Sequence, residues 1–147
     1  MRTYGEERYA GQISRAIVRR RETQPFSRSA DLVDVVRGAL PIPARFGEGH
    51  PAKRVFQALR IAVNRELEGL DAFVHAALAR LQVGGRLAVI AFHSLEDRIV
   101  KHTLRALAQG PNPSLAVLTK RPVIADDAET AMNPRSRSAK LRAAEAL

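Results

Sequence analysis

The polar cluster at residues 93–97 lies at a position where catalytic or ligand-binding side chains are often found. His93-Ser94-Leu95-Glu96-Asp97 directly follows an apolar run and opens a helical pattern. In open α/β sheets, ligands bind beyond the carboxyl ends of strands, at junctions of this kind. Helix capping is the other interpretation, because Ser94 with Asp97 three residues later matches a capping box. Capping leaves His93 unexplained, so a direct chemical role stays open. A Ser–His hydrolase is a weaker alternative, since the sequence has no Gly-x-Ser-x-Gly motif.

A second cluster combines cations and hydroxyls in a short turn. The sequence Asn133-Pro134-Arg135-Ser136-Arg137-Ser138-Ala139-Lys140 brings together the cations Arg135, Arg137 and Lys140. Such a turn can bind phosphate through guanidinium groups and backbone N–H groups. An ordinary basic hairpin turn has the same composition, so residue chemistry alone leaves both interpretations open.

A polar stripe follows one side of a predicted helix. Its members, at spacings of four, three and four, are Lys53, Gln57, Arg60 and Asn64. Most polar stripes are solvated faces. Gln and Asn inside a helix have no propensity advantage over Lys or Glu, however, so a contact role is the alternative.

Pro and Gly clusters divide the chain into the elements that must position these side chains. Apolar periodicity predicts helices over residues 6–21 and, with Ser29 as the N-cap, up to residue 40. A loop is expected over residues 45–49. One long helix is predicted over residues 52–81, with Gly69 as a point where it could bend.

The remaining third of the chain is predicted to contain strands. Arg86–Phe92 has a continuous apolar run, which is typical of a parallel strand covered on both faces. A helix follows it and stops at residues 110–113, and residues 115–122 and 138–146 are two further candidate strands. The pattern predicts the end of an open α/β sheet after a separate helical lobe, with too few strands for a complete doubly wound sheet.

Composition excludes several classes of protein. The 147 residues include 24 Lys and Arg against 15 Asp and Glu, a formal net charge of +9. Strongly basic domains often bind nucleic acid, although a solvated basic surface would give the same balance. Aromatic residues make up only 5%, with no Trp, which argues against base stacking on a row of aromatics. The absence of Cys excludes disulfides and thiolate metal sites and fits a cytoplasmic protein.

Other functional motifs are missing as well. No apolar run approaches the roughly 18 to 20 residues of a membrane-spanning helix. The sequence contains no Gly-x-Gly-x-x-Gly and no Walker loop, and its four His residues lack the spacing of metal ligands. We therefore expect no metal site and no known cradle for a nucleotide cofactor.

Four stretches together resemble one family. The sequences at residues 4–8, 50–67, 84–98 and 133–142 are similar, in this order, to the MraW/RsmH family. Its members are bacterial S-adenosylmethionine-dependent methyltransferases that modify N4 of a cytidine in small-subunit ribosomal RNA. The family's Gly-rich cofactor loop, its acidic ribose ligand and a later Asp-Leu-Gly segment belong to its upstream half and are missing here. The chain resembles only the C-terminal half, as a truncated gene, a mis-called start codon or a split protein would.

The resemblance implies an α/β fold with two parts. Residues 1–65 correspond to an inserted helical lobe for substrate recognition, and residues 66–147 to the C-terminal part of a Rossmann-type methyltransferase sheet. A flipped-out cytidine would accept the methyl group. In that reaction His93 and Ser94 would border the target pocket. The candidate RNA-binding residues are Lys53, Gln57, Arg60, Asn64, Arg135, Arg137 and Lys140.

The missing half determines what we expect of this chain alone. Without the family's cofactor motif it should bind no S-adenosylmethionine and transfer no methyl group. The alternative is a stand-alone basic RNA-binding module without catalysis. Expected partners are small-subunit ribosomal RNA and either the missing N-terminal half or a second copy bound at an exposed sheet edge, without any membrane.

Overall fold

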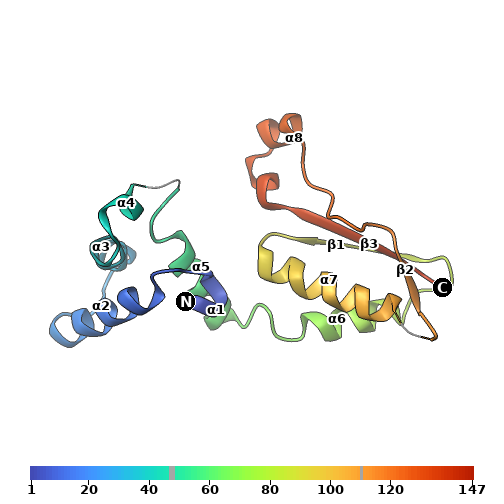
Figure 1. Ribbon diagram of the computed structural model, residues 1–147, viewed down its shortest axis with the longest axis horizontal. Helices are drawn as coiled ribbons and strands as arrows, with labels where there is room; N and C mark the ends of the chain where they lie inside the picture. Colours follow the sequence, from blue (N-terminus) through green and yellow to red (C-terminus); the bar gives the residue numbers. More distant parts are fainter. Residues whose placement is uncertain (47–48, 110) are drawn as a thin grey trace. The chain divides into compact units, whose positions relative to one another are not determined.

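The computed structural model describes residues 1–46, 49–109 and 111–147 and divides into two compact units (Figure 1). The first is Met1–Glu66, called here the helical unit, and the second is Leu67–Leu147, called the sheet unit. The expected loop over residues 45–49 and the expected helix stop at 110–113 lie partly outside the described residues. No described helix has both the length and the apolar character needed to cross a bilayer.

The helical unit is built from short amphipathic helices around a small core. Its elements are α1 (Arg2–Gly5), α2 (Ala10–Thr23), α3 (Ser29–Ala39), α4 (Ile42–Arg45) and α5 (Lys53–Asn64). The core consists of Ile13, Val36, Leu40, Ala52 and Val55. The predicted helices over residues 6–21 and 29–40 correspond to α2 and α3, so the periodicity of their apolar residues was a sufficient signal.

The N-terminus of α3 differs from the predicted cap. Ser29 is the first helical residue, and Arg28 precedes the helix. The carboxylate of Asp31 instead accepts the backbone N–H groups of Ser27 at 3.0 Å and Arg28 at 2.9 Å. These bonds lower the pKa of Asp31 from 3.8 to about 2.

A close approach between α1 and α5 requires Gly5. A Cβ atom at this position would lie 2.4 Å from the carbonyl oxygen of Arg54 and 3.2 Å from the Cβ of Ala58. Gly5 is buried and lacks that atom, so the two helices can pack backbone against backbone.

The single long helix predicted over residues 52–81 is wrong. α5 ends at Asn64, and α6 covers Leu70–Leu78. Between them Arg65 has φ 54° and Gly69 has φ 73°. Both residues have a left-handed backbone conformation, which does not occur within a continuous right-handed α-helix. Helical periodicity continues on either side because α5 and α6 are each amphipathic.

The sheet unit is a mixed α/β structure. The strands described in it, β1 (Arg86–Ala91), β2 (Leu115–Val117) and β3 (Lys140–Ala146), form a sheet in the order β1-β3-β2. The helices are α6, α7 (Ser94–Ala108), α8 (Asp127–Met132) and the 3₁₀-helix η1 (Pro134–Ser138). Val74, Val100, Leu104, Leu115 and Ala144 form the core. Figure 1 shows α6 and α7 beside the sheet.

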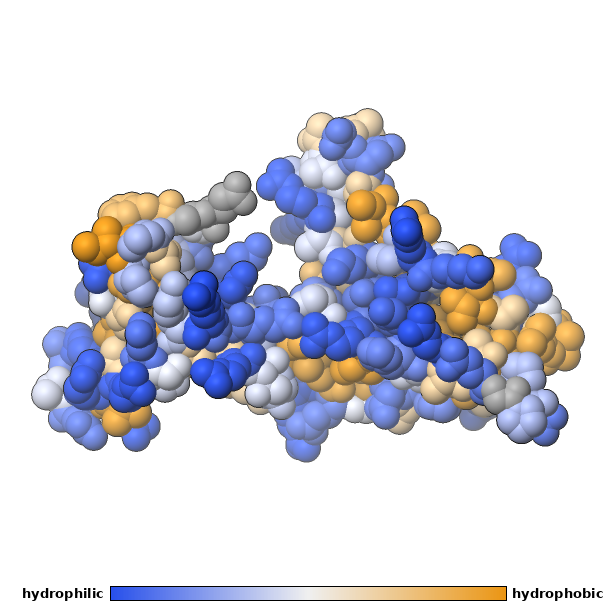
Figure 2. Space-filling view, viewed as in Figure 1, coloured by the Kyte–Doolittle hydropathy of each residue, from blue (hydrophilic) through white to orange (hydrophobic). Residues whose placement is uncertain are grey.

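The expectation that residues 86–92 form a parallel strand covered on both faces is wrong for this chain. β1 pairs antiparallel with β3 and is an edge strand of the described sheet. Leu87 and Val89 pack into the core, whereas the side chain of Ile90 is 54% exposed. Within the described residues, no second layer covers the face of β1 that carries Ile90. Figure 2 shows both hydrophilic and hydrophobic side chains on the surface of this unit.

Candidate functional site

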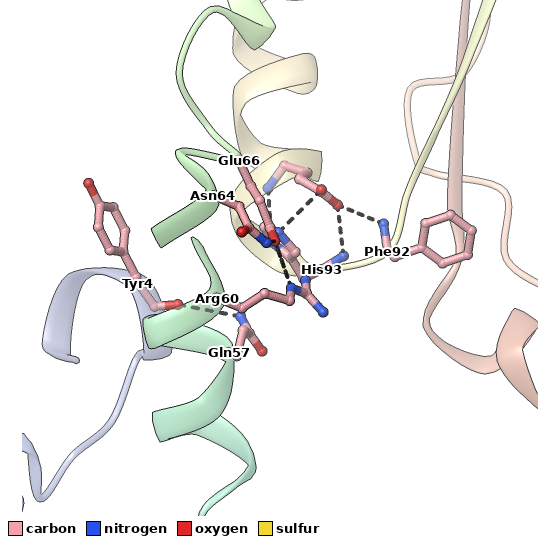
Figure 3. A network of polar contacts seen from close by, with 8 residues as sticks. Tyr4, Gln57, Arg60, Asn64, Glu66, Phe92 and His93 are labelled. Atoms are coloured by element: carbon pink, nitrogen blue, oxygen red, sulfur yellow. Dashed lines mark hydrogen bonds and ion pairs between the residues drawn. The ribbon is translucent and has the colours of Figure 1, made fainter. Parts of the chain in front are cut away.

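The strand-to-helix junction after β1 is held by a capping box that the sequence did not predict. His93 Nδ1 accepts the backbone N–H of Glu96 at 3.3 Å. The Glu96 carboxylate in turn accepts the N–H groups of Phe92 at 2.9 Å and His93 at 3.3 Å (Figure 3). The box expected from Ser94 and Asp97 is therefore wrong, because the helix starts one residue earlier than that box requires.

The buried imidazole of His93 has one ring nitrogen without a hydrogen bond. Its side chain is 8% exposed, and Nε2 lies 3.3 Å from Oε1 of Glu96. Because Nδ1 accepts a hydrogen bond, the proton of a neutral imidazole is on Nε2. Within the described residues this N–H has no hydrogen-bond partner. The nearby Glu96 oxygen is therefore an ion-pair contact when the imidazole is protonated, and a role for His93 at the border of a pocket stays a prediction.

Asp97 points to the sheet and not to the helix cap. Its carboxylate accepts two hydrogen bonds from Arg142 on β3, from Nε at 2.6 Å and from Nη2 at 3.1 Å. These bonds hold the pKa of Asp97 below its ordinary value of 3.8, and the charges of Lys140 and Lys101 add to the effect.

Three members of the predicted polar stripe make contacts inside the helical unit. Arg60 Nε donates to both carboxylate oxygens of Glu66, at 2.8 and 3.1 Å. Asn64 Nδ2 donates to Oε1 of Glu66 at 3.0 Å, and Gln57 Nε2 donates to the carbonyl of Tyr4 at 3.4 Å (Figure 3). The stripe therefore has an internal structural role, and RNA binding by these side chains stays a prediction.

Lys53, the fourth member, lies at a separate cavity of about 260 Å³. This cavity is also lined by Glu7, Arg8, His50 and Arg54, which were not among the residues predicted to form a site. Glu7 is 6% exposed, and its carboxylate accepts the N–H of Tyr9 at 2.8 Å. The density of charge in Glu6-Glu7-Arg8 was the available signal.

The basic turn forms a 3₁₀-helix and not a hairpin turn. Asn133 Oδ1 accepts the N–H of Arg135 at 3.3 Å, and the buried Ser136 hydroxyl donates to the Asn133 carbonyl at 2.8 Å. Arg135 and Arg137 lie on either side of this anchor and are both exposed. Neither forms an ion pair within the described part of the chain. This arrangement presents two guanidinium groups to solvent from an ordered backbone, which suits phosphate binding.

The two carboxylates that follow β1 give no support for binding of S-adenosylmethionine at this junction. This cofactor carries a sulfonium cation and ribose hydroxyls, for which acidic groups at the carboxyl ends of strands are suitable partners. At the end of β1 the Glu96 carboxylate is engaged by backbone N–H groups, and that of Asp97 is engaged by Arg142. Both carboxylates of this junction, those of Glu96 and Asp97, are therefore already engaged.

Comparison with known proteins identifies the family. The model of the MraW methylase family matches residues 1–147. The chain belongs to this family. Among curated proteins, it is 51% identical over 158 residues to "Ribosomal RNA small subunit methyltransferase H" of Heliobacterium modesticaldum, covering 99% of this chain and 50% of that protein. Proteins of the same name from Beutenbergia cavernae and Nostoc sp. are 53% and 54% identical over 98% and 97% of the chain, and 47% and 44% of their own lengths.

These comparisons confirm the MraW/RsmH resemblance that the four sequence stretches indicated. They also give the extent of the match. This MraW-family chain spans about half the length of the curated relatives it matches. The four stretches lie in both units, because residues 4–8 and most of 50–67 belong to the helical unit and residues 84–98 and 133–142 to the sheet unit.

Proposed function

We propose that this chain is the RNA-holding part of a small-subunit ribosomal RNA methyltransferase that acts on N4 of a cytidine with S-adenosylmethionine as the methyl donor. In this proposal residues 1–65 are an inserted substrate-recognition lobe, and residues 66–147 complete the methyltransferase sheet. Membership of the MraW methylase family and the names of the relatives support the reaction class.

The observation that carries the RNA-holding role is the anchored turn at residues 133–138. Two exposed guanidinium groups project from it, and the buried Ser136 holds its backbone. Guanidinium forks match phosphate oxygens in geometry as well as in charge. The formal net charge of +9 adds a long-range attraction for RNA.

Under the same proposal, this chain alone does not transfer a methyl group. Transfer requires the methyl group to be held within about 3 to 3.5 Å of the amine nitrogen. The acidic groups after β1 are engaged in the helix cap and in the sheet, so they support no cofactor binding. His93, with its buried Nε2, and the neighbouring Ser94 would border the pocket for the target base once a cofactor-binding half is present.

RNA binding measured over a range of salt concentrations tests the RNA-holding role. The Arg135→Ala/Arg137→Ala variant should bind a single-stranded RNA more weakly. Its plot of log K against log salt should be flatter by roughly 1 to 2 units, because each phosphate contact contributes about 0.7 to 0.9. An unchanged slope would exclude phosphate contacts by this turn.

A matched control removes the same charge elsewhere. Arg21 and Arg80 are exposed and lie outside the turn. The Arg21→Ala/Arg80→Ala variant has the same net charge as the turn variant, so it should keep the slope of the original chain. An equal loss in both variants would mean that net charge alone, and not the turn, holds the RNA.

A further inference from the structure

A cavity in the sheet unit lies between the second half of α7 and the segment that begins with β2. Its volume is about 280 Å³. Helix α7 contributes Lys101, Leu104, Arg105 and Ala108, the segment from β2 contributes Val117, Thr119 and Lys120, and β3 contributes Arg142. All of these residues belong to the same compact unit.

The charged side chains on the described cavity wall are all cations. No described residue that lines it is a carboxylate. Arg142 has its counter-charge in Asp97, which it binds through two hydrogen bonds. Lys101, Arg105 and Lys120 form no ion pair within the described residues.

Interaction with the helix dipole explains the position of only one of these three cations. Arg105 lies in the last turn of α7, where a cation interacts well with the helix dipole. Lys101 lies one turn earlier on the same face, and like charges four residues apart destabilise a helix. Lys120 belongs to no helix. An anion between these three groups would relieve their mutual repulsion.

The floor of the cavity is apolar. Leu104 is 2% exposed, and Ala108 and Val117 are half-buried beside it. The Thr119 hydroxyl is already engaged, because it accepts the N–H of Ala143 at 2.9 Å. The cavity is much larger than a single water, which occupies about 30 Å³ in the liquid. A phosphate group alone would leave the apolar floor uncovered, whereas a sugar or base attached to the phosphate would cover it.

We propose that this cavity binds one phosphorylated nucleoside unit. Its phosphate lies between Lys101, Arg105 and Lys120, and its sugar and base lie against Leu104, Ala108 and Val117. The source of the unit rests on the proposed function: it is one nucleotide of the bound RNA strand. A free mononucleotide offers the same chemistry, so the test separates the two sources.

The direct test is calorimetric titration of the full chain with cytidine 5′-monophosphate, with inorganic phosphate and with cytidine. The monophosphate should bind at least tenfold more tightly than either fragment. Lys101→Gln/Arg105→Gln/Lys120→Gln should weaken its binding at least tenfold. Arg2→Gln/Arg21→Gln/Arg80→Gln, which removes the same charge at exposed positions outside the cavity, should change it less than twofold. Equal affinities in the two variants, or equal binding of phosphate alone, would overturn the proposal.

Two further variants separate a loss of binding from a loss of folding. Lys120 is exposed, so Lys120→Gln should leave thermal unfolding unchanged and still weaken binding severalfold. Ala108→Phe keeps every charge and fills the apolar floor, so it should reduce binding of the monophosphate and leave that of inorganic phosphate unchanged. Full binding of the monophosphate to both variants would overturn the proposal.

Competition identifies the source of the ligand. A single-stranded RNA of twelve nucleotides should displace the monophosphate from the original chain, and failure to displace it would overturn the RNA source. The outcome also distinguishes this inference from the proposed function. If RNA affinity falls in the Arg135→Ala/Arg137→Ala variant but not in the cavity variants, the RNA-holding turn stands and the bound RNA strand is excluded as the source of the cavity ligand.

Discussion

The carboxylate of Asp97 and the guanidinium of Arg142 tie the first turn of α7 to the central strand of the sheet. The two hydrogen bonds, of 2.6 and 3.1 Å, join residues that lie 45 positions apart in the sequence. The Asp97 and Arg142 side chains are 13% and 7% exposed, respectively. Each charge is tolerated away from water because the other compensates it.

Removal of Arg142 should therefore destabilise the sheet unit. Arg142→Met keeps most of the side-chain volume but leaves the Asp97 carboxylate without its partner. We expect a loss of about 2–3 kcal/mol in the free energy of unfolding. Hydrogen exchange of the β3 amides measures it. The Asp97→Asn/Arg142→Met double variant should recover part of the loss, and a single variant as stable as the original would contradict the role of the pair.

The stability of the N-terminus of α3 should depend on pH only under strongly acidic conditions. The pKa of Asp31 is lowered from 3.8 to about 2, so its contribution is complete above 3.8 and is lost as the pH falls through about 2. NMR titration of the Asp31 carboxyl carbon measures this value. In Asp31→Asn, the amide shifts of Ser27 and Arg28 should show no titration in this range. A midpoint near 3.8 would mean that the hydrogen bonds to Ser27 and Arg28 do not persist in solution.

A methyl group at Gly5 should separate α1 from α5. Because its Cβ would lie 2.4 Å from a backbone oxygen, Gly5→Ala should destabilise the helical unit by about 1–3 kcal/mol. Gly38→Ala is the matched control, since a Cβ there meets no atom within 4 Å and Ala favours the helix. Both Tyr residues of the chain lie in this unit, so thermal unfolding followed by Tyr fluorescence reports on it. Equal melting temperatures for the two variants would contradict the close packing of α1 on α5.

The exposed apolar face of the sheet, which carries Ile90, should cause the isolated chain to self-associate. Ile90 and Phe92 are 54% and 55% exposed, and β1 is an edge strand of the described sheet. Exposed apolar strands at sheet edges recruit other chains. We expect dimers, aggregates or binding of a hydrophobic dye, and Ile90→Lys should reduce all three. Ile42→Lys, at an exposed position of α4, should have less effect. A monodisperse monomer that unfolds cooperatively and binds no dye would oppose this prediction.

Cofactor binding should require the segment of the relatives that this chain does not cover. Calorimetry with S-adenosylmethionine should show no heat of binding to this chain, because the carboxylates after β1 are engaged. Addition of the upstream half of a relative should restore cofactor binding and methyl transfer to RNA. Micromolar affinity of the chain alone would contradict the proposal. Lack of recovery with the upstream half would favour the alternative of an RNA-binding module without catalysis.

Sequence periodicity was sufficient for elements whose structure is decided locally. The apolar stripes of α2, α3 and α7 depend on residues three and four apart, which a sequence displays directly. The break at Arg65 was not predictable in the same way, because Arg rarely adopts a left-handed conformation and the apolar pattern continues beyond it. The antiparallel pairing of β1 depends on β3, about fifty residues later, and no local pattern shows it.

The features of the candidate site also separate into those decided by local sequence and those that depend on distant residues. The exposure of Arg135 and Arg137 follows from a local turn with Pro and Ser, whereas the sequence left open whether this turn is a phosphate site or an ordinary hairpin turn. The capping box was assigned one residue too late because His is an unusual N-cap, although Glu96 three residues later was a visible signal. The contacts of Arg60 and Asn64 with Glu66 depend on the chain turning back after α5, which periodicity does not describe.

The position of β3 in the sheet has a consequence for synthesis of the protein. β3 follows β1 and β2 in the sequence but lies between them in space. In the described sheet β1 and β2 both pair with β3, so the three-stranded sheet cannot form until residues 140–146 have left the ribosome. The helical unit precedes these residues and relies on contacts within residues 1–66, so it can fold while translation continues. Pairings across such long stretches close slowly. The apolar residues of α6 and α7 therefore emerge from the ribosome well before the strand that completes their core.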